Sequence, residues 1–137
     1  MTIAIIASNE KKELMVQLCI AYCGILSTHR ICSTAATGNV ISDSTGLSVE
    51  KLLTGSGGGV DQIASRISCS EIDLLIFFRS SDPNDPERES ANSMLRLCDL
   101  YNVPFATNLA TAEALILALG RGDLDWRENI KKTANKI

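Results

Sequence analysis

The sequence has few aromatic residues and no excess of positive charge. It contains three phenylalanines, two tyrosines and one tryptophan, and its 13 lysines and arginines are outnumbered by 16 aspartates and glutamates. Nucleic-acid-binding domains instead concentrate basic charge, often with stacking aromatic residues, on one surface. We therefore expect no nucleic-acid partner, and a small molecule is the better candidate.

Long hydrophobic runs are also missing. The strongest uncharged apolar stretch covers residues 74–78, far short of the roughly 20 residues that span a bilayer. Residues 1–7 lack the basic residues of a signal peptide, so they are expected to form a strand of the mature fold. These features predict a cytoplasmic protein that is not held in a membrane.

Paired cysteines and clustered metal ligands are absent too. The five cysteines are an odd number without CxxC spacing, which favours reduced cysteines packed in the core. Cys19 and Cys23 lie four residues apart on a predicted helix, but a metal site would need further ligands and His29 is the only histidine. The sequence therefore predicts no metal.

The chain is long enough for one domain with one core, and residues 1–137 are treated as that domain. Apolar runs alternate with amphipathic helical patterns, which is typical of βα units. We predict an α/β fold: a single three-layer domain in which helices cover both faces of a mostly parallel sheet. Strands are expected at residues 3–7, near 31, 73–78 and 103–107. Helices are expected at 10–25, after 39, at 60–67, 87–102, 110–119 with Gly120 as its end, and 123–132.

Three segments that follow predicted strands or open helices suit an anion. Residues 34–38 and 54–56 combine hydroxyl side chains with glycine, and Lys12 opens the first helix with a positive charge. Each segment also has an ordinary explanation as a helix cap, a tight turn or a solvated lysine. Neither GxxxxGK[ST] nor GxGxxG in a strand-to-helix turn occurs. The pattern therefore favours a pocket for a single phosphate group of a small metabolite over a nucleotide site.

Taken together, these segments resemble the methylglyoxal synthase family over nearly the whole chain. The matching stretches follow one another in order at near-identical spacing, at residues 3–7, 34–39, 53–63, 72–78, 97–104 and 106–112. The resemblance implies a homohexamer of α/β subunits that converts dihydroxyacetone phosphate to methylglyoxal and inorganic phosphate. It also implies that no metal or organic cofactor takes part.

The resemblance carries over a set of phosphate-binding positions. The family's lysine falls on Lys12, its threonine-rich stretch on residues 34–37, and its serine-glycine pair on Thr54 and Gly55. The inner glycine and threonine of that stretch become Ala35 and Ala36, between the retained Thr34 and Thr37, and a family histidine after the first strand becomes Ser8. The implied partner is a phosphorylated small molecule or inorganic phosphate.

The catalytic positions of the family differ in this chain. Val60 occupies the place of the catalytic aspartate, with Asp61 one residue later, which is a rotation of roughly 100° on a helix. Asn84 replaces a histidine, and Glu87 replaces an aspartate. Valine cannot accept a proton and asparagine cannot exchange one usefully, while the loss of one general acid or base typically costs about 10² to 10⁴ in rate.

Two functional hypotheses follow. The first is a homologue that binds dihydroxyacetone phosphate or a similar metabolite with weak or lost synthase activity, acting as a sensor or a regulatory subunit. The alternative is an active methylglyoxal synthase, a carbon–oxygen lyase that uses Asp61 or Glu87 as the base and Asn84 only as an electrostatic stabiliser.

Overall fold

A five-stranded sheet forms the centre of the molecule in a computed structural model, which describes the backbone of residues 1–135 and the side chains of residues 1–131. The strand order is β3-β2-β1-β4-β5, and every neighbouring pair is parallel. The strands are β1 (Thr2–Ala7), β2 (Arg30–Ser33), β3 (Val49–Lys51), β4 (Leu74–Phe78) and β5 (Phe105–Ala106). The predicted α/β fold with a parallel sheet is confirmed.

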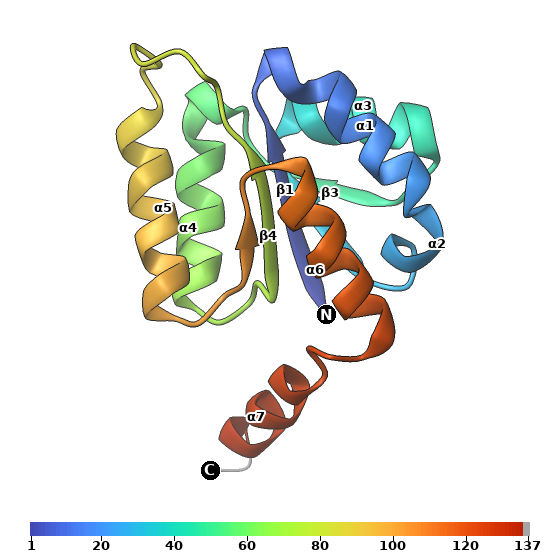
Figure 1. Cartoon of the computed structure of the whole chain (residues 1–137). Helices are drawn as coiled ribbons and strands as arrows, with labels where there is room; N and C mark the ends of the chain where they lie inside the picture. The colour runs from blue at the N-terminus through green and yellow to red at the C-terminus, as the bar shows by residue number, and fades with distance from the viewer. Residues whose placement is uncertain (136–137) are drawn as a thin grey trace.

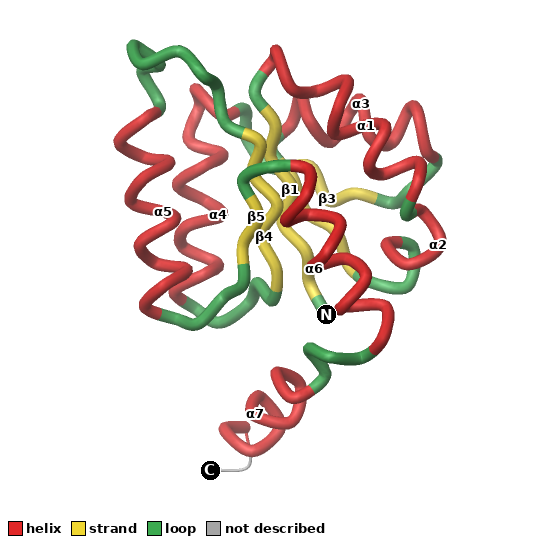
Figure 2. The backbone as a smooth tube through the Cα atoms, in the orientation of Figure 1, coloured by secondary structure: helices red, strands yellow, loops and turns green. Residues whose placement is uncertain are grey.

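Helices cover both faces of this sheet (Figures 1 and 2). One face carries α1 (Lys12–Ala21), α2 (Cys23–Leu26), α3 (Ala35–Thr45) and α6 (Leu109–Arg121), and the other carries α4 (Val60–Ser68) and α5 (Arg88–Leu100). Two short helical turns, η1 (Asn9–Lys11) and η2 (Gly55–Gly59), precede α1 and α4, and α7 (Trp126–Asn135) follows α6. The chain thus has the three layers that the alternating pattern predicted.

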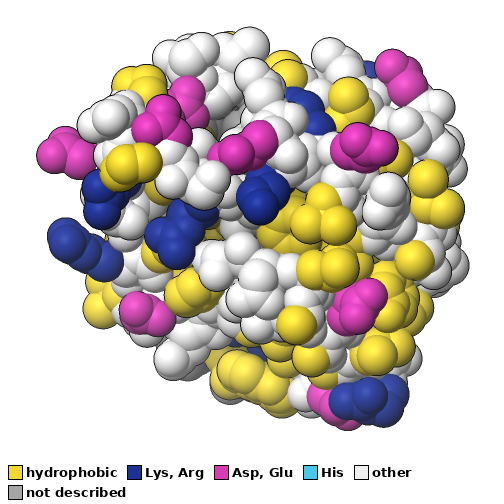
Figure 3. All heavy atoms as spheres, turned by 45° about the horizontal axis from the view of Figure 1, so that its top comes forward, with side chains coloured by type: hydrophobic (Ala, Val, Ile, Leu, Met, Phe, Trp, Pro, Cys, Tyr) yellow, Lys and Arg dark blue, Asp and Glu magenta, His cyan; other side chains and the backbone are white. Residues whose placement is uncertain are grey.

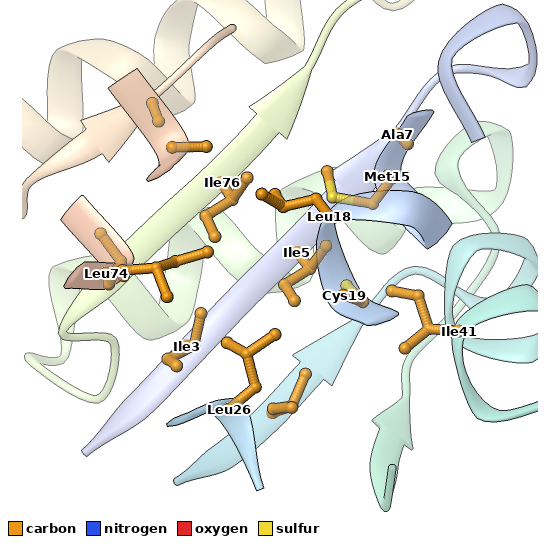
Figure 4. Packing of buried hydrophobic residues seen from close by; sticks show 14 of the residues in the cluster. Ile3, Ile5, Ala7, Met15, Leu18, Cys19, Leu26, Ile41, Leu74 and Ile76 are labelled. Atoms are coloured by element: carbon orange, nitrogen blue, oxygen red, sulfur yellow. The ribbon is translucent and has the colours of Figure 1, made fainter. Parts of the chain in front are cut away.

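The central strand β1 is apolar at successive positions because both of its faces are covered. Ile3 and Ile5 point into the core under α1 and α6, whereas Ala4 and Ile6 contribute to the core under α4 and α5. Figure 4 shows the first core, in which Met15 and other helix residues pack on these strand side chains. The continuous run at residues 3–7 therefore belongs to a buried parallel strand.

Several helix bounds differ from the sequence expectation. The helix expected at 10–25 is interrupted at Tyr22, which lies between α1 and α2. The sixth helix ends at Arg121 with Gly122 in the left-handed conformation, so Gly120 is not its cap. Gly120 instead lies against Ile25, where an added Cβ would come within 2.8 Å of Cδ1. Close helix packing, rather than termination, explains that glycine.

The edge strand β3 was not predicted, because Val49, Glu50 and Lys51 are partly or fully exposed and form no apolar run. The helix expected after residue 39 starts earlier, because α3 already begins at Ala35. Among the described residues, no helix is long and apolar enough to cross a membrane.

Candidate functional site

A pocket of about 470 Å³ lies at the carboxyl ends of β1 and β4. From β1 the chain proceeds through β2 to β3 on one side of the sheet, and β4 then pairs with β1 on its other side. Such a switch point leaves a crevice where ligands of open α/β sheets bind. Figure 3 looks obliquely onto this end of the molecule, where basic and acidic side chains are intermixed.

The glycine-rich segment 54–59 forms one wall as a tight helical turn. Thr54 caps this turn, and its Oγ1 accepts a hydrogen bond from the N–H of Gly57 at 3.0 Å. Gly58 has a φ of 103°, and a Cβ on Gly59 would lie only 2.2 Å from the carbonyl oxygen of Leu53. Only glycine fits these two positions, so the backbone can turn sharply at the pocket and enter α4 directly.

The start of α3 forms a second wall. Thr34 and Ala36 line the pocket, and the N–H groups in the first turn of a helix have no partners within the helix. Thr37 lies behind this wall: it is fully buried, and its hydroxyl bonds to the backbone of Ala7 at 3.2 Å. The N–H of Ala35 donates to Leu53. Thr37 and Ala35 therefore hold α3 in place and do not line the pocket.

Lys12 brings positive charge to the pocket from the start of α1. Its Nζ donates to the carbonyl oxygen of Ala7 at 2.9 Å and to Oδ1 of Asn9 at 2.8 Å. An ammonium group has three N–H donors, so one remains for a ligand. Burial lowers the pKa of Lys12, and the negative charge of Glu87 acts against this shift. The lysine is held by β1 and its neighbouring turn in a fixed position.

Ser8 places a buried hydroxyl at the same pocket. Its Oγ has no hydrogen-bond partner among the described atoms, and a buried polar atom of this kind calls for a ligand or a water. Ile6, Val60 and Phe77 line the pocket nearby as apolar side chains. The site therefore combines polar groups with an apolar wall.

Glu87 contributes the carboxylate of the pocket. Its Oε2 lies 3.0 Å from the position that a Cβ on Gly55 would occupy, so the carboxylate stands over the glycine turn. Glu87 precedes α5 and reaches this position from the loop after β4. Its N–H donates to Oδ1 of Asp85 at 3.1 Å, which fixes the backbone at the start of the helix.

The loop after β4 is tied to the turn after β1 beside the pocket. Glu10 accepts hydrogen bonds from the N–H of Ser81 at 2.6 Å and from its hydroxyl at 3.3 Å. The hydrogen bond from the Ser81 backbone is the main cause that lowers the pKa of Glu10. These hydrogen bonds join the turn after β1 to the loop after β4, and the two segments carry Lys12 and Glu87 to the same pocket.

Two residues predicted as catalytic candidates lie elsewhere. Asp61 is exposed on the first turn of α4 and does not line the pocket, whereas its neighbour Val60 is buried and does. Asn84 is exposed in the loop and also does not line the pocket. The structure thus brings together Ser8, Lys12, Thr34, Ala36, Thr54, Gly55 and Glu87, but not Asp61, Asn84, Ala35 or Thr37.

The sequence analysis missed other polar residues at the pocket. Asn9, Glu10 and Asp85 line it as well. Their position directly after β1 or in the loop after β4 could have identified them, since strand-to-helix loops meet at one edge of a parallel sheet. Within residues 1–131, no three potential metal-ligating side chains form a group that could hold an ion. Of the free cysteines, Cys19, Cys32 and Cys98 are buried.

Comparisons with known proteins agree with one another. Residues 15–107 match the family model described as MGS-like domain. A methylglyoxal synthase of Caldicellulosiruptor saccharolyticus is 50% identical over 136 residues, which cover 99% of this chain and 96% of the relative. A methylglyoxal synthase of Oceanobacillus iheyensis is 44% identical over 99% of this chain and 97% of its own length.

The fold comparison points the same way. A crystal structure of methylglyoxal synthase from Elizabethkingia anophelis superimposes with a TM-score of 0.77 and is 32% identical in sequence. The match covers 84% of this chain and 76% of that one. The chain belongs to the methylglyoxal synthase family of MGS-like domains.

Proposed function

We propose that the protein is a methylglyoxal synthase that converts dihydroxyacetone phosphate to methylglyoxal and inorganic phosphate, with Glu87 as its base. The observation that carries this proposal is the position of the Glu87 carboxylate, which stands over Gly55 in the same pocket as Lys12. A base and a phosphate-binding cation thus face one small space at the switch point of the sheet.

The phosphate group of the substrate would lie between Lys12 and the glycine turn. The free N–H of the Lys12 ammonium, the Thr54 hydroxyl and backbone N–H groups in the first turns of η2 and α3 are donors suited to phosphate oxygens. These groups also stabilise phosphate as it leaves, because its negative charge grows when the carbon–oxygen bond breaks.

Glu87 would remove a proton from the carbon that bears the free hydroxyl. The electron pair forms an enediolate with its charge on the former carbonyl oxygen, and the neighbouring hydroxyl would pass its proton to that oxygen. The terminal oxygen then becomes the aldehyde, the double bond shifts and phosphate leaves from the third carbon, which gives the enol of methylglyoxal; the enol becomes the product when its hydroxyl proton moves to the terminal carbon. The Ser8 hydroxyl is placed to donate a hydrogen bond to an enediolate oxygen. The apolar side chains of Val60 and Phe77 lower the polarity of this wall of the pocket, which strengthens electrostatic interactions beside it.

The similar relatives support an active enzyme over the weak or lost activity expected from the sequence. Relatives at 44–50% identity over nearly the whole chain bear the name methylglyoxal synthase. Asp61, the other candidate base, is exposed and outside the pocket, which leaves Glu87 as the better candidate. A homohexamer in the cytoplasm is part of the same proposal, and light scattering on the purified protein tests its size.

A second candidate function is binding of the phosphorylated metabolite without turnover. The buried Val60 side chain favours it, because this residue puts an apolar group into the pocket beside the phosphate donors. Such a protein would sense or sequester the metabolite. It predicts tight phosphate binding with no methylglyoxal formed.

Turnover of dihydroxyacetone phosphate distinguishes the two functions. Methylglyoxal and phosphate release are measured for the wild type, for Glu87→Gln and for Glu89→Gln, a matched change on the exposed side of α5. We expect Glu87→Gln to lower kcat by about 10² to 10⁴ while phosphate binding persists and Glu89→Gln resembles the wild type. Phosphate binding by a wild type that forms no methylglyoxal would establish the binding function instead.

A further inference from the structure

A second hollow adjoins the candidate active site at the end of β4. Its volume is about 340 Å³, and the loop after β4 and the first turns of α5 enclose it. The two hollows share Phe77, Ser80, Asp85 and Ala91 as lining residues. A ligand held at Lys12 could therefore extend past Ser80 and Asp85 into the second hollow.

We propose that this second hollow is an anion subsite, in which Arg79 and Arg88 bind the second anionic group of a small organic molecule that carries two such groups, one of them a phosphate at Lys12. The inference rests on the phosphate pocket of the proposed function but not on its turnover. The ligand class is a bisphosphate, or a phosphorylated acid of similar length. Such a ligand would occupy the place of a triose phosphate and compete with it.

The positive charge of the subsite is available to a ligand. Arg79 and Arg88 both line the hollow and are exposed, and neither is in an ion pair within the part of the chain that the structure describes. Arg88 uses one nitrogen, Nη1, to donate to the carbonyl oxygen of Pro83 at 3.2 Å. Because a guanidinium group has five N–H donors in a planar fork, most of them remain for a carboxylate or phosphate.

The acidic residues of the hollow are engaged with the loop itself. Oδ1 of Asp82 accepts from the N–H of Asn84 at 2.9 Å, and Oδ1 of Asp85 accepts from the N–H of Glu87 at 3.1 Å. The N–H of Asp82 in turn donates to the hydroxyl of Ser80 at 3.1 Å. These bonds fix the shape of the loop and use one oxygen of each carboxylate, and neither carboxylate forms an ion pair with Arg79 or Arg88 in the described part of the chain.

A ligand with two anionic groups should bind more tightly than a ligand with one. Once the phosphate is held at Lys12, the second group meets the arginines at a high effective concentration. A charge-assisted contact of this kind corresponds to about a tenfold gain in affinity or more. The gain depends on chain length, since a short ligand cannot reach both hollows and a long one loses effective concentration.

Calorimetry with a series of linear diol bisphosphates and the matching monophosphates tests the subsite. We expect the wild type to bind the best bisphosphate at least about tenfold more tightly than its monophosphate, beyond the statistical factor of about two from two equivalent ends. We also expect that bisphosphate to compete with dihydroxyacetone phosphate. Equal affinities across the series would overturn the subsite.

Substitution of Arg79 and Arg88 provides a second test of the subsite. Arg79→Gln and the Arg79→Gln/Arg88→Gln pair should reduce or abolish the bisphosphate preference and leave monophosphate affinity unchanged. Arg96→Gln is the control, because Arg96 is exposed on the same helix and lines neither hollow. A preference that survives in the double variant overturns the assignment. If the wild type also fails to bind monophosphates, the phosphate pocket of the proposed function is wrong as well.

Discussion

The Glu87 carboxylate lies directly against Gly55: a Cβ at position 55 would come within 3.0 Å of Oε2 and 3.4 Å of Oε1. Since these atoms are the far end of a flexible side chain, Gly55→Ala should fold but push the carboxylate away from its place over the glycine turn. A displacement of about 1 Å at a reacting group costs up to about 10²-fold. We expect Gly55→Ala to lower kcat by about tenfold or more.

Gly24→Ala is the matched control for this prediction. A Cβ on Gly24, in α2, would meet nothing within 4 Å, and alanine is favoured over glycine in a helix by roughly 0.5–1 kcal/mol. Its turnover should equal that of the wild type with equal or higher stability. Wild-type kcat in Gly55→Ala, with the same fold by circular dichroism, would contradict the role given to Glu87.

We predict that phosphate binding weakens at alkaline pH, because the ammonium group of Lys12 loses its proton there. Burial lowers the pKa of this lysine, with the Glu87 charge opposing the shift, so the ammonium loses its proton at lower pH than an ordinary lysine. The protonated form binds anions. Phosphate affinity should therefore fall with rising pH already below the usual lysine range near 10.4.

Variants of Lys12 test whether this lysine is the group whose titration weakens phosphate binding. Lys12→Gln should weaken phosphate binding by about 10- to 100-fold, because a hydrogen bond to a charged group contributes about 1.5–3 kcal/mol. Lys12→Arg should move the alkaline fall to higher pH, since arginine stays protonated. Lys11→Gln serves as the control because Lys11 does not line the pocket. An alkaline fall that is identical in Lys12→Arg would show that another group titrates.

The sequence predicted which segments of the chain form this site, but not which of their side chains point into the pocket. Periodicity and loop composition placed Lys12, Thr34 and Thr54 correctly at one sheet edge, because parallel strands end at the same edge. Composition could not separate Thr37, which faces the backbone of Ala7, from Thr34, which faces the pocket. That distinction depends on which side of the first turn of α3 packs against β1, a tertiary contact without a local sequence signal.

The same limit applies to the strands and to Glu87. Continuous apolar runs predicted β1 and β4 because both of their faces are buried. The exposed edge strand β3 has no such run and was missed. Glu87 was one of two candidate bases in the sequence, and the structure shows that it lines the pocket whereas Asp61 does not.

We predict that substitution of Asp61 does not reduce turnover. Its side chain is exposed on the first turn of α4 and outside the pocket, where a carboxylate interacts favourably with the helix dipole. Asp61→Asn should leave kcat and KM close to the wild type and cost about 0.3–1 kcal/mol of stability. Steady-state kinetics with dihydroxyacetone phosphate and urea unfolding measure both. A loss of turnover comparable to that of Glu87→Gln would make Asp61 the base.

Asp73 lies at the amino end of β4, at the end of the sheet opposite the pocket. Its side chain is 1% exposed and accepts hydrogen bonds from the N–H of Thr2 at 2.9 Å and from Nε of Arg127 at 3.2 Å, with Nζ of Lys131 at 2.5 Å. Arg127 and Lys131 belong to α7. This carboxylate therefore joins the last helix to the start of β1, and Asp73→Asn should leave the buried Arg127 without its counter-charge.

The pH dependence of stability follows from the same contacts. Burial alone would raise the pKa of Asp73, but the hydrogen bonds from Lys131 and Thr2 and the charge of Lys131 hold it below its usual value. In the unfolded chain the group titrates near 3.9, so its contribution is fully present above that pH. The contribution is lost as the pH falls through the lower pKa of the folded state.

Asp123→Asn is the control, because it removes an exposed ion pair whose contribution to stability can be compared with that of the buried pair at Asp73. Asp123 pairs with Arg121 at 2.9 Å with both side chains exposed, and such pairs contribute about 0–1 kcal/mol. Asp73→Asn should cost about 3–5 kcal/mol at pH 7, because it breaks a buried pair. Urea unfolding between pH 7 and pH 3 should also show a smaller acid-induced loss in Asp73→Asn than in the wild type. Equal costs for the two substitutions would mean that the contacts of Asp73 do not stabilise α7 on the sheet.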